Sequence, residues 1–207
     1  MYGVRVRRGP CRSPIPVAAT GMDAVTHCIE AVLAPQINPP AEGIGLEGLG
    51  RAVGDGWLKK AVLDGSDKDA RWNMMMASLE GALAFVKGLG AVHALSHAAG
   101  RLSDLKLHHG TLNAVFLPAV LRFNAPQCGE KYERIRQTIG LAPGADLAEA
   151  ISVMNADIGL PSGLRAMGVL DEDIPDLIAY AMKDLSVLTN PRTASEDDFE
   201  AMIRASF

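Results

Sequence analysis

The histidines of this chain are confined to three short stretches, and their spacing could place several of them around one metal ion. The five are His27, His93, His97, His108 and His109. Asp23 precedes His27 by four residues, and His93 precedes His97 by four. Residues four apart lie on the same face of a helix, so each pair could offer two ligand atoms to one ion. Carboxylate and imidazole ligands together suit Fe(II) or Zn(II).

Each stretch also has a structural explanation that needs no metal. Thr20 could cap the first helix with Asp23 as its partner in a capping box, and His27 could be a core histidine with a satisfied hydrogen bond. The pair at positions 93 and 97 could be two histidines on one helix face. His108 and His109 stand together at a predicted helix start, where either could be a solvated turn residue.

Taken together, the three stretches favour a metal site over these separate explanations. They supply one carboxylate and up to four imidazoles, and a site built from one Asp and three His leaves room for a substrate oxygen. His93 and His97 stand among small apolar residues, where a buried imidazole needs a partner. The H-E-x-x-H pattern of zinc proteases is not present, so the sequence does not indicate that class.

The elements that must carry these residues are predicted to be helices throughout. Aromatic residues make up 5% of the chain, whereas the unbranched residues that favour helices are plentiful. Ser66 with Asp69 has the spacing of a capping box before the third helix. Apolar periodicity and Gly or Pro breaks predict helices near residues 21–34, 39–63, 67–87, 91–102, 110–123, 129–139, 145–158, 171–187 and 195–205. We therefore expect an all-α domain over residues 20–207, after an irregular basic leader over residues 1–19.

Composition and charge argue against several classes of protein. The net charge of −4 gives no general attraction to nucleic acid. The apolar run 114–121 is too short to span a bilayer, so we expect no membrane segment. The three cysteines, Cys11, Cys28 and Cys128, form neither a disulfide framework nor a zinc pattern, which indicates a reducing compartment and hence the cytoplasm.

The Arg-rich leader has no apolar segment of the kind a secretory signal needs. Prolines such as Pro14 and Pro16 would break the amphipathic helix of a transit peptide. We expect a solvated tail or a misassigned start of the reading frame.

Four stretches resemble the iron-containing alcohol dehydrogenase family, in the family's order along the chain. They are AATGMDAVTHCIEA (18–31), GLGAVHALSH (88–97), HGTLNAVFLP (109–118) and LTNPR (188–192). The resemblance implies a helical bundle like the C-terminal domain of dehydroquinate synthase-like and iron-dependent alcohol dehydrogenases. It implies Asp23, His27, His93 and His109 as metal ligands. It implies for His97 a role beside the metal, where the side chain contacts cofactor or substrate and relays a proton.

The loop before His109 is about two residues longer than in many relatives, which leaves His108 as a competing ligand. We prefer His109 because Gly110 and Asn113 then stand in the family's register. Glu30 could orient a ligand from outside the metal's coordination sphere, or could be a solvated helix residue.

The family's N-terminal α/β domain, with its Gly-Gly-Gly-Ser motif for the NAD(P) pyrophosphate, does not occur in this sequence. A formal G-x-G-x-x-G is present at Gly43, Gly45 and Gly48. It follows no predicted strand, so we expect close helix packing or a flexible stretch instead of dinucleotide binding.

The resemblance implies a metal-dependent alcohol dehydrogenase domain in which the metal is a Lewis acid and NAD(P) carries the hydride. The metal is expected to be Fe²⁺, with Zn²⁺ as the alternative, and the substrate a small alcohol or aldehyde. We expect the domain to be incomplete without a nucleotide-binding half, and to form a homo-oligomer or to pack against such a missing N-terminal domain. The alternatives are a metal-binding helical module without redox activity, and a metal-dependent hydrolase or lyase.

Overall fold

A computed structural model describes residues 14–207, and none of these residues lies in a strand. The α-helices are α1 (Pro14–Leu33), α2 (Pro39–Leu49), α3 (Trp57–Leu63), α4 (Lys68–Ala84), α5 (Ala91–Ala99), α6 (His109–Thr138), α7 (Leu147–Asp157), α8 (Ile174–Ala181) and α9 (Glu196–Arg204). Shorter helical turns are η1 (Gly50–Gly54), η2 (Phe85–Lys87), η3 (Ser103–Leu105), η4 (Arg165–Met167), η5 (Asp171–Asp173) and η6 (Leu185–Thr189). The predicted all-α fold is confirmed for the described residues.

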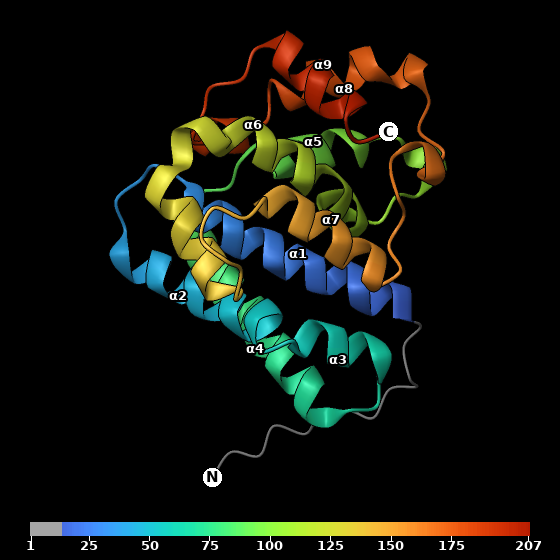
Figure 1. Cartoon of the computed structure of the whole chain (residues 1–207). Helices are drawn as coiled ribbons and strands as arrows, with labels where there is room; N and C mark the ends of the chain where they lie inside the picture. The colour runs from blue at the N-terminus through green and yellow to red at the C-terminus, as the bar shows by residue number, and fades with distance from the viewer. Residues whose placement is uncertain (1–13) are drawn as a thin grey trace.

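Helix α1 runs through the middle of the molecule, with α2, α3 and α4 on one side and α5, α8 and α9 on the other (Figure 1). It packs against α6, α4 and α2. Met22, Val25, Ile29 and Val32 of α1 are fully buried and belong to the hydrophobic core. Residues on α1 are therefore held by neighbours on several sides.

Helix α1 begins at Pro14, seven residues before the predicted start at Gly21. Proline is tolerated in the first turn of a helix, because the N–H groups there have no helical partner to lose. The Thr20 hydroxyl donates to the Pro16 carbonyl at 2.8 Å, so Thr20 lies inside the helix and does not cap it. The prediction of irregular structure is thus wrong for residues 14–19, and the rest of the predicted leader, with Cys11, lies outside the described residues.

The C-terminal end of α1 is closed by two lysines from other helices. The Lys87 ammonium is buried and donates to the carbonyls of Ala31, Val32 and Ala34 at 2.7–3.0 Å. Lys131 donates to the Ala34 carbonyl at 2.6 Å. The last carbonyls of a helix carry partial negative charge and lack helical donors, so two cations there stabilise the end of α1.

Several helix boundaries differ from the predictions for local reasons. Asp67, not Ser66, caps α4, because the Asp67 carboxylate accepts from the N–H groups of Asp69 and Ala70. The segment predicted as one helix over 39–63 is divided by η1. The helix predicted over 171–187 is divided too, since α8 ends at Ala181 and Asp184 caps η6 through the Ser186 N–H.

The helices predicted at 110–123 and 129–139 are joined in α6, which bends at Gly129 (φ 34°, ψ −113°). Pro118 lies inside α6 and cannot donate to the Ala114 carbonyl four residues earlier. The buried Asn155 side chain of α7 donates to that carbonyl at 2.7 Å instead. A helix from elsewhere in the chain thus compensates for the proline.

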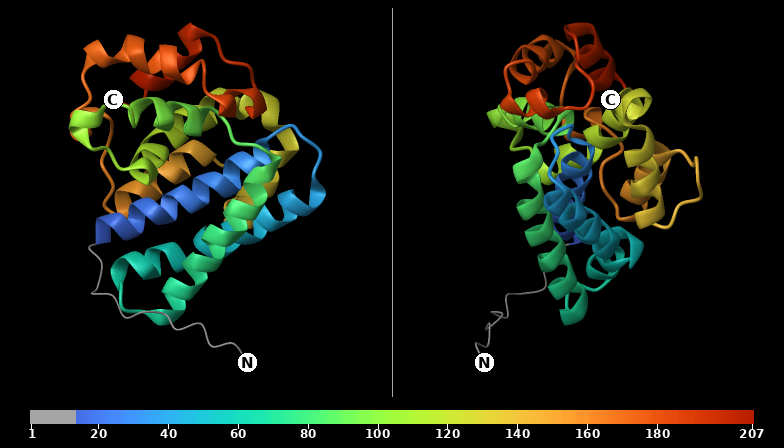
Figure 2. Two further views of the ribbon diagram at one scale, coloured as in Figure 1. Left: turned by 180° about the vertical axis from the view of Figure 1, so that it is seen from behind. Right: turned by 90° about the vertical axis from the view of Figure 1, so that its left-hand side faces the viewer.

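The outward face of α4 carries larger apolar side chains than its inward face. Small residues, Ala70, Ala77, Gly81 and Ala84, face the core, and α4 crosses the outside of the molecule (Figure 2). The outward residues Trp72, Met75, Leu79, Leu83 and Val86, which we call the α4 stripe, are 45–71% exposed. Large apolar residues at helical spacing on a surface indicate a face that packs against another polypeptide.

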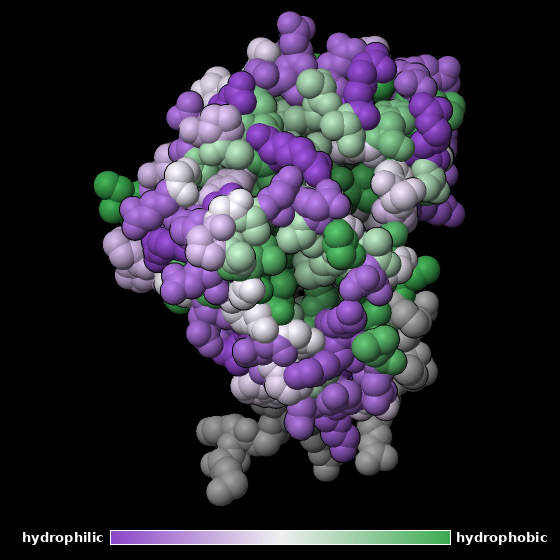
Figure 3. Space-filling model, in the orientation of Figure 1, coloured by the Kyte–Doolittle hydropathy of each residue, from purple (hydrophilic) through white to green (hydrophobic). Residues whose placement is uncertain are grey.

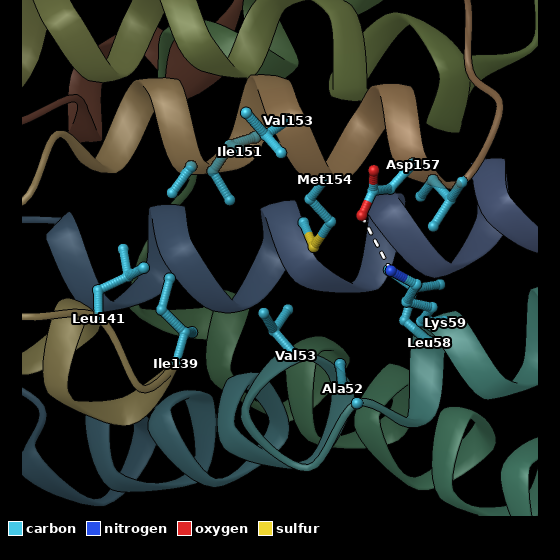
Figure 4. Close-up of a pocket in the computed structure, with 13 residues that line it drawn as sticks. Ala52, Val53, Leu58, Lys59, Ile139, Leu141, Ile151, Val153, Met154 and Asp157 are labelled. Atoms are coloured by element: carbon cyan, nitrogen blue, oxygen red, sulfur yellow. Dashed lines mark hydrogen bonds and ion pairs between the residues drawn. The ribbon is translucent and has the colours of Figure 1, made fainter.

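An apolar cavity of about 250 Å³ lies between η1, α3 and α7. Hydrophobic surface gathers in this part of the face seen in Figure 3. Apolar side chains such as Val53, Ile151 and Met154 line it, and the ion pair of Lys59 with Asp157 (2.9 Å) stands at its edge (Figure 4). The cavity contains none of the five histidines, so it is separate from the site described below.

Within residues 14–207 no single helix has the length and hydropathy needed to cross a membrane, and one pair bent by 107°, Lys68–Lys87 with Ala91–Ala99, meets these criteria only when its two parts are counted together.

Candidate metal centre

Helix α1 presents three polar side chains on one face. Asp23, His27 and Glu30 follow one another at spacings of four and three residues, which places them along one line of a helix. Glu30 is buried, while Asp23 and His27 are partly exposed. The predicted pair at positions 23 and 27 is therefore extended by a buried carboxylate one turn further along.

Helix α5 delivers His93, and Glu30 fixes the start of that helix. One Glu30 oxygen accepts from the Val92 N–H at 2.8 Å, and the other lies 2.6 Å from His93 Nδ1. The Ala91 N–H donates to Asn190 Oδ1 at 3.0 Å. A Cβ on Gly90 would lie 2.7–2.8 Å from these same two side chains, so glycine is needed for this approach. Of the two roles considered for Glu30, the solvated one is wrong, because the residue is 5% exposed.

His109 is the first residue of helix α6, and its side chain lies in a different environment from that of His108. His108 occupies the N-cap position and its side chain is exposed. His109 Nε2 lies 3.5 Å from Asp23 Oδ1, and its Nδ1 lies 3.3 Å from the Ser96 hydroxyl. The backbone of Gly110 lies directly against α1, where an added Cβ would stand 2.1 Å from the Ala19 carbonyl oxygen. The structure therefore places His109 next to Asp23, while His108 faces outward.

The three predicted imidazole ligands converge on the Asp23 carboxylate. Its Oδ1 lies 3.5 Å from His109 Nε2, 3.9 Å from His93 Nε2 and 4.0 Å from His27 Nδ1. Asp23, His27 and His93 each offer a ligand atom within 4.8 Å of the others, and the rings of His27 and His93 stack at 4.6 Å. Neighbouring ligands on bonds of about 2.1 Å stand roughly 3–3.5 Å apart, so a small contraction would close Asp23, His27 and His93 on one ion, with His109 next to Asp23.

The surroundings keep two of the imidazoles in the form that binds metals. Burial lowers the pKa of His27 from 6.5 to about 4, and the neighbouring His93 adds to this effect. Burial also lowers the pKa of His109, although Asp23 opposes the shift. A neutral imidazole has a lone pair to offer, so neither ring needs to lose a proton at neutral pH before it binds an ion.

The side chain of Asn113 supports the fit of this donor set to a cation. Its Nδ2 stands among three of the predicted ligands, 2.7 Å from Asp23 Oδ1, 3.3 Å from His93 Nε2 and 3.2 Å from His109 Nε2. A group with partial positive charge thus occupies the point that these lone pairs face. One carboxylate and three imidazoles are a suitable set for Fe²⁺ or Zn²⁺.

His97 lies beside the cluster without joining it. Its ring stacks on that of His109 at 5.3 Å, and its Nδ1 lies 2.8 Å from the Asp184 carboxylate. Its side chain is 46% exposed, and Nε2 forms no hydrogen bond with another residue in the range 14–207. Burial opposes ionisation of Asp184, but hydrogen bonds with Ser186, and then the pairing with His97, lower its pKa overall. Asp184 also caps η6. A ring held at Nδ1 and open at Nε2 can exchange a proton with a ligand.

The glycines of the formal G-x-G-x-x-G lie in helix α2. A Cβ at Gly48 would stand 2.9 Å from Cys28 Sγ and from Glu80 Cβ, and Gly45 contacts Ala84 and Val32. Nothing lies within 4 Å of the Cβ position at Gly43. Two of the three glycines thus serve close helix packing, which is the first of the two explanations that the sequence suggested for this motif.

Sequence reasoning missed Asp184 and gave Asn113 no role beyond its register. Asn113 follows His109 by four residues, and this spacing was a usable signal. Asp184 is 87 residues from His97, and no local pattern connects them.

Comparison with known proteins agrees with the resemblance. Residues 17–207 match the family described as "Fe-containing alcohol dehydrogenase family, C-terminal". The chain is 52% identical over 196 residues to 4-hydroxybutyrate dehydrogenase of Cupriavidus necator, a match that covers 91% of this chain and 51% of that protein. It is 38% identical over 204 residues to 1,3-propanediol dehydrogenase of Citrobacter freundii, covering 94% and 52%.

The fold is also that of solved structures. It superposes on the crystal structure of a 1,3-propanediol oxidoreductase with a TM-score of 0.88 and 36% identity, covering 95% of this chain and 53% of that one. An alcohol dehydrogenase from Oenococcus oeni gives a TM-score of 0.87 at 25% identity, covering 95% and 52%. The chain thus spans about half the length of the proteins it matches.

Proposed function

Since the chain belongs to the iron-containing alcohol dehydrogenase family, whose C-terminal part it matches, we propose that it is the metal-binding half of an alcohol dehydrogenase. The proposed reaction is the oxidation of a small alcohol, or the reduction of the corresponding aldehyde, with NAD(P). The observation that carries the proposal is the approach of three imidazoles, from three different helices, to the Asp23 carboxylate.

The proposed ligands are Asp23, His27, His93 and His109, with Fe²⁺ as the proposed metal and Zn²⁺ as the alternative. Such an ion supplies a Lewis acid for the alcohol or carbonyl oxygen. The chain contributes the orientation of the donor atoms. Glu30 holds His93 from one side, and Ser96 meets His109 at Nδ1. Partners of this kind direct the opposite nitrogen of each ring toward the metal.

We propose that His97 moves the proton between the substrate hydroxyl and solvent. Asp184 holds Nδ1, and the exposed side of the ring lies next to His109. An imidazole that is held at one nitrogen and exposed at the other can accept a proton and release it to water.

The hydride acceptor is proposed to be NAD(P) bound by another polypeptide segment, because α2 uses its glycines for packing. The names of the relatives suggest short-chain alcohols with a terminal hydroxyl group as substrates. We further propose a reducing compartment, the cytoplasm, which agrees with the free thiols of Cys28 and Cys128.

The proposal is tested by elemental analysis and by an activity assay. Protein purified without chelator is expected to contain one metal ion per chain. The N-terminal half of the 4-hydroxybutyrate dehydrogenase relative, added to this chain, is expected to give NAD(P)-dependent oxidation of 4-hydroxybutyrate or 1,3-propanediol. Stoichiometric metal without turnover in the mixture would favour a metal-binding module without redox activity. If the protein still contained no metal after anaerobic incubation with Fe²⁺ or Zn²⁺, both the dehydrogenase proposal and the metal-binding module would be contradicted.

The α4 stripe predicts that the 207-residue chain associates with itself in solution. Apolar surface of this kind is removed from water by contact with another polypeptide, and another copy is available in a purified sample. We expect light scattering to give a mass above the 21.9 kDa of one chain. Leu79→Glu with Leu83→Lys is expected to restore the monomer, because two charges on the stripe oppose its burial.

Ile37→Glu with Leu63→Lys provides the matched control, since these two exposed apolar residues lie outside the stripe. This control is expected to associate as the unmodified chain does. If the unmodified chain remained a monomer at high concentration, the predicted self-association through the α4 stripe would be wrong.

A further inference from the structure

Asn113 directs all of its hydrogen bonding toward the candidate metal ligands. It lies on α6, four residues after His109, and is completely buried. Its Nδ2 donates to Asp23 Oδ1 and lies within 3.3 Å of the Nε2 atoms of His93 and His109. Its Oδ1 is buried without a hydrogen-bond partner in the described part of the chain.

The orientation of this amide follows from the chemistry of its neighbours. A carboxylate oxygen only accepts hydrogen bonds, so the group 2.7 Å from Asp23 Oδ1 must be the NH₂ of Asn113. The same NH₂ faces both imidazoles, and a donor requires a lone pair opposite. One of its two hydrogens is donated to Asp23, and the other is shared between the two Nε2 atoms when both carry lone pairs.

Contacts on the other side of each ring show where the ring protons lie. His93 Nδ1 lies 2.6 Å from a Glu30 oxygen, which only accepts, so this nitrogen carries the proton. His109 Nδ1 lies 3.3 Å from the Ser96 hydroxyl, whose own hydrogen is donated to the His93 carbonyl oxygen at 3.1 Å. His109 Nδ1 is therefore the donor. Both rings have their proton on Nδ1 and their lone pair on the side of Asp23.

We propose that Asn113 is a positioning residue that orders the metal ligands before an ion binds. Its amide joins Asp23 of α1, His93 of α5 and His109 of α6 through one NH₂ group, and it holds their lone pairs toward one point. The proposal rests on the proposed function, since it takes these residues as the ligands of a metal.

The test compares Asn113→Leu with Asn155→Leu in a titration of metal-free protein with Zn²⁺ against a competing chelator. Leucine has the shape of asparagine and forms no hydrogen bond. Asn155 is the matched control, since it is also buried, also has a carbonyl oxygen without a partner, and bonds to α6 at Ala114. We expect Asn113→Leu to weaken Zn²⁺ binding about 10- to 100-fold, as loss of an outer partner does. Asn155→Leu is expected to keep the wild-type affinity.

Equal Zn²⁺ affinities for the two variants would overturn the proposal, because a general loss of packing in α6 would then explain both. A second readout uses unmodified, metal-free protein, so it does not depend on how a variant folds. Nitrogen NMR of the imidazoles is expected to show unprotonated Nε2 in His93 and His109. Protonated Nε2 in either ring would overturn the proposal. Failure of the unmodified chain to bind Zn²⁺ would contradict the proposed function, and the NMR result would then decide the ordering role of Asn113 by itself.

Discussion

Asp23→Ala is expected to abolish stoichiometric metal binding. Asp23 is the carboxylate to which His27, His93 and His109 are all adjacent, at 3.5–4.0 Å. Its removal deletes one of four proposed ligands and also the acceptor that holds Asn113. Loss of a residue that only hydrogen-bonds to a metal ligand weakens metal binding about 10- to 100-fold. Loss of a ligand itself should therefore weaken metal binding by more than about 100-fold. Elemental analysis after dialysis, together with a Zn²⁺ titration, measures the effect.

Asp184→Ala is the matched control for this variant. Asp184 is also a carboxylate paired with a histidine, but it contacts His97 and none of the four proposed ligands. The control is expected to keep its metal. If Asp23→Ala retained one ion per chain, or if both variants lost it equally, the proposed ligand set would be wrong.

Gly110→Ala is expected to destabilise the chain strongly and to impair the site at the same time. The added Cβ would stand 2.1 Å from the Ala19 carbonyl oxygen and 2.7 Å from its carbon, and these backbone atoms cannot rotate away. An ordinary contact of this kind is about 3.3 Å, so α1 and α6 would have to separate by roughly 1 Å. Because His109 is the neighbour of Gly110 and Asp23 lies on α1, the same separation would move two proposed ligands apart.

Urea unfolding measures the first effect and Zn²⁺ titration the second. Overpacking of a core typically costs about 1–3 kcal/mol, and rigid backbone on both sides favours the upper part of that range. Gly43→Ala is the control, since its Cβ would meet nothing within 4 Å and it lies on helix α2 with an ordinary φ. That variant is expected to stabilise the chain by about 0.5–1 kcal/mol. A Gly110→Ala protein that unfolds at the wild-type urea concentration would contradict this account of the helix crossing.

The part of the site that could be predicted from the sequence is the part with local spacing. Asp23 and His27 form one helix-face pair, and His109 and Asn113 form another, because residues four apart meet on a helix. The resemblance to the family joined Asp23, His27, His93 and His109 into one site. The tertiary structure supplied what spacing could not, the contact of His97 with Asp184 and of His93 with Glu30, across 87 and 63 residues.

The fold class was predictable from composition, and the helix ends were not. Pro14 and Pro16 were interpreted as breakers, although proline in a first turn loses no helical hydrogen bond. The buried ammonium of Lys87 satisfies carbonyls 53–56 residues away, so nothing near it in the sequence shows that a lysine belongs inside the protein. Such long-range compensation, like that of Asn155 for Pro118, becomes visible only when the helices are placed together.

The distribution of the proposed ligands over α1, α5 and α6 has a consequence for biosynthesis. A nascent chain that has left the ribosome as far as α4 contains only Asp23 and His27 of the four proposed ligands, so half of the donor set is still missing. His93 and His109 emerge about 70 and 86 residues after Asp23 along the sequence. Metal acquisition must therefore follow translation of the first half of the chain, and a ribosome stalled before α6 would present a polypeptide that cannot be loaded.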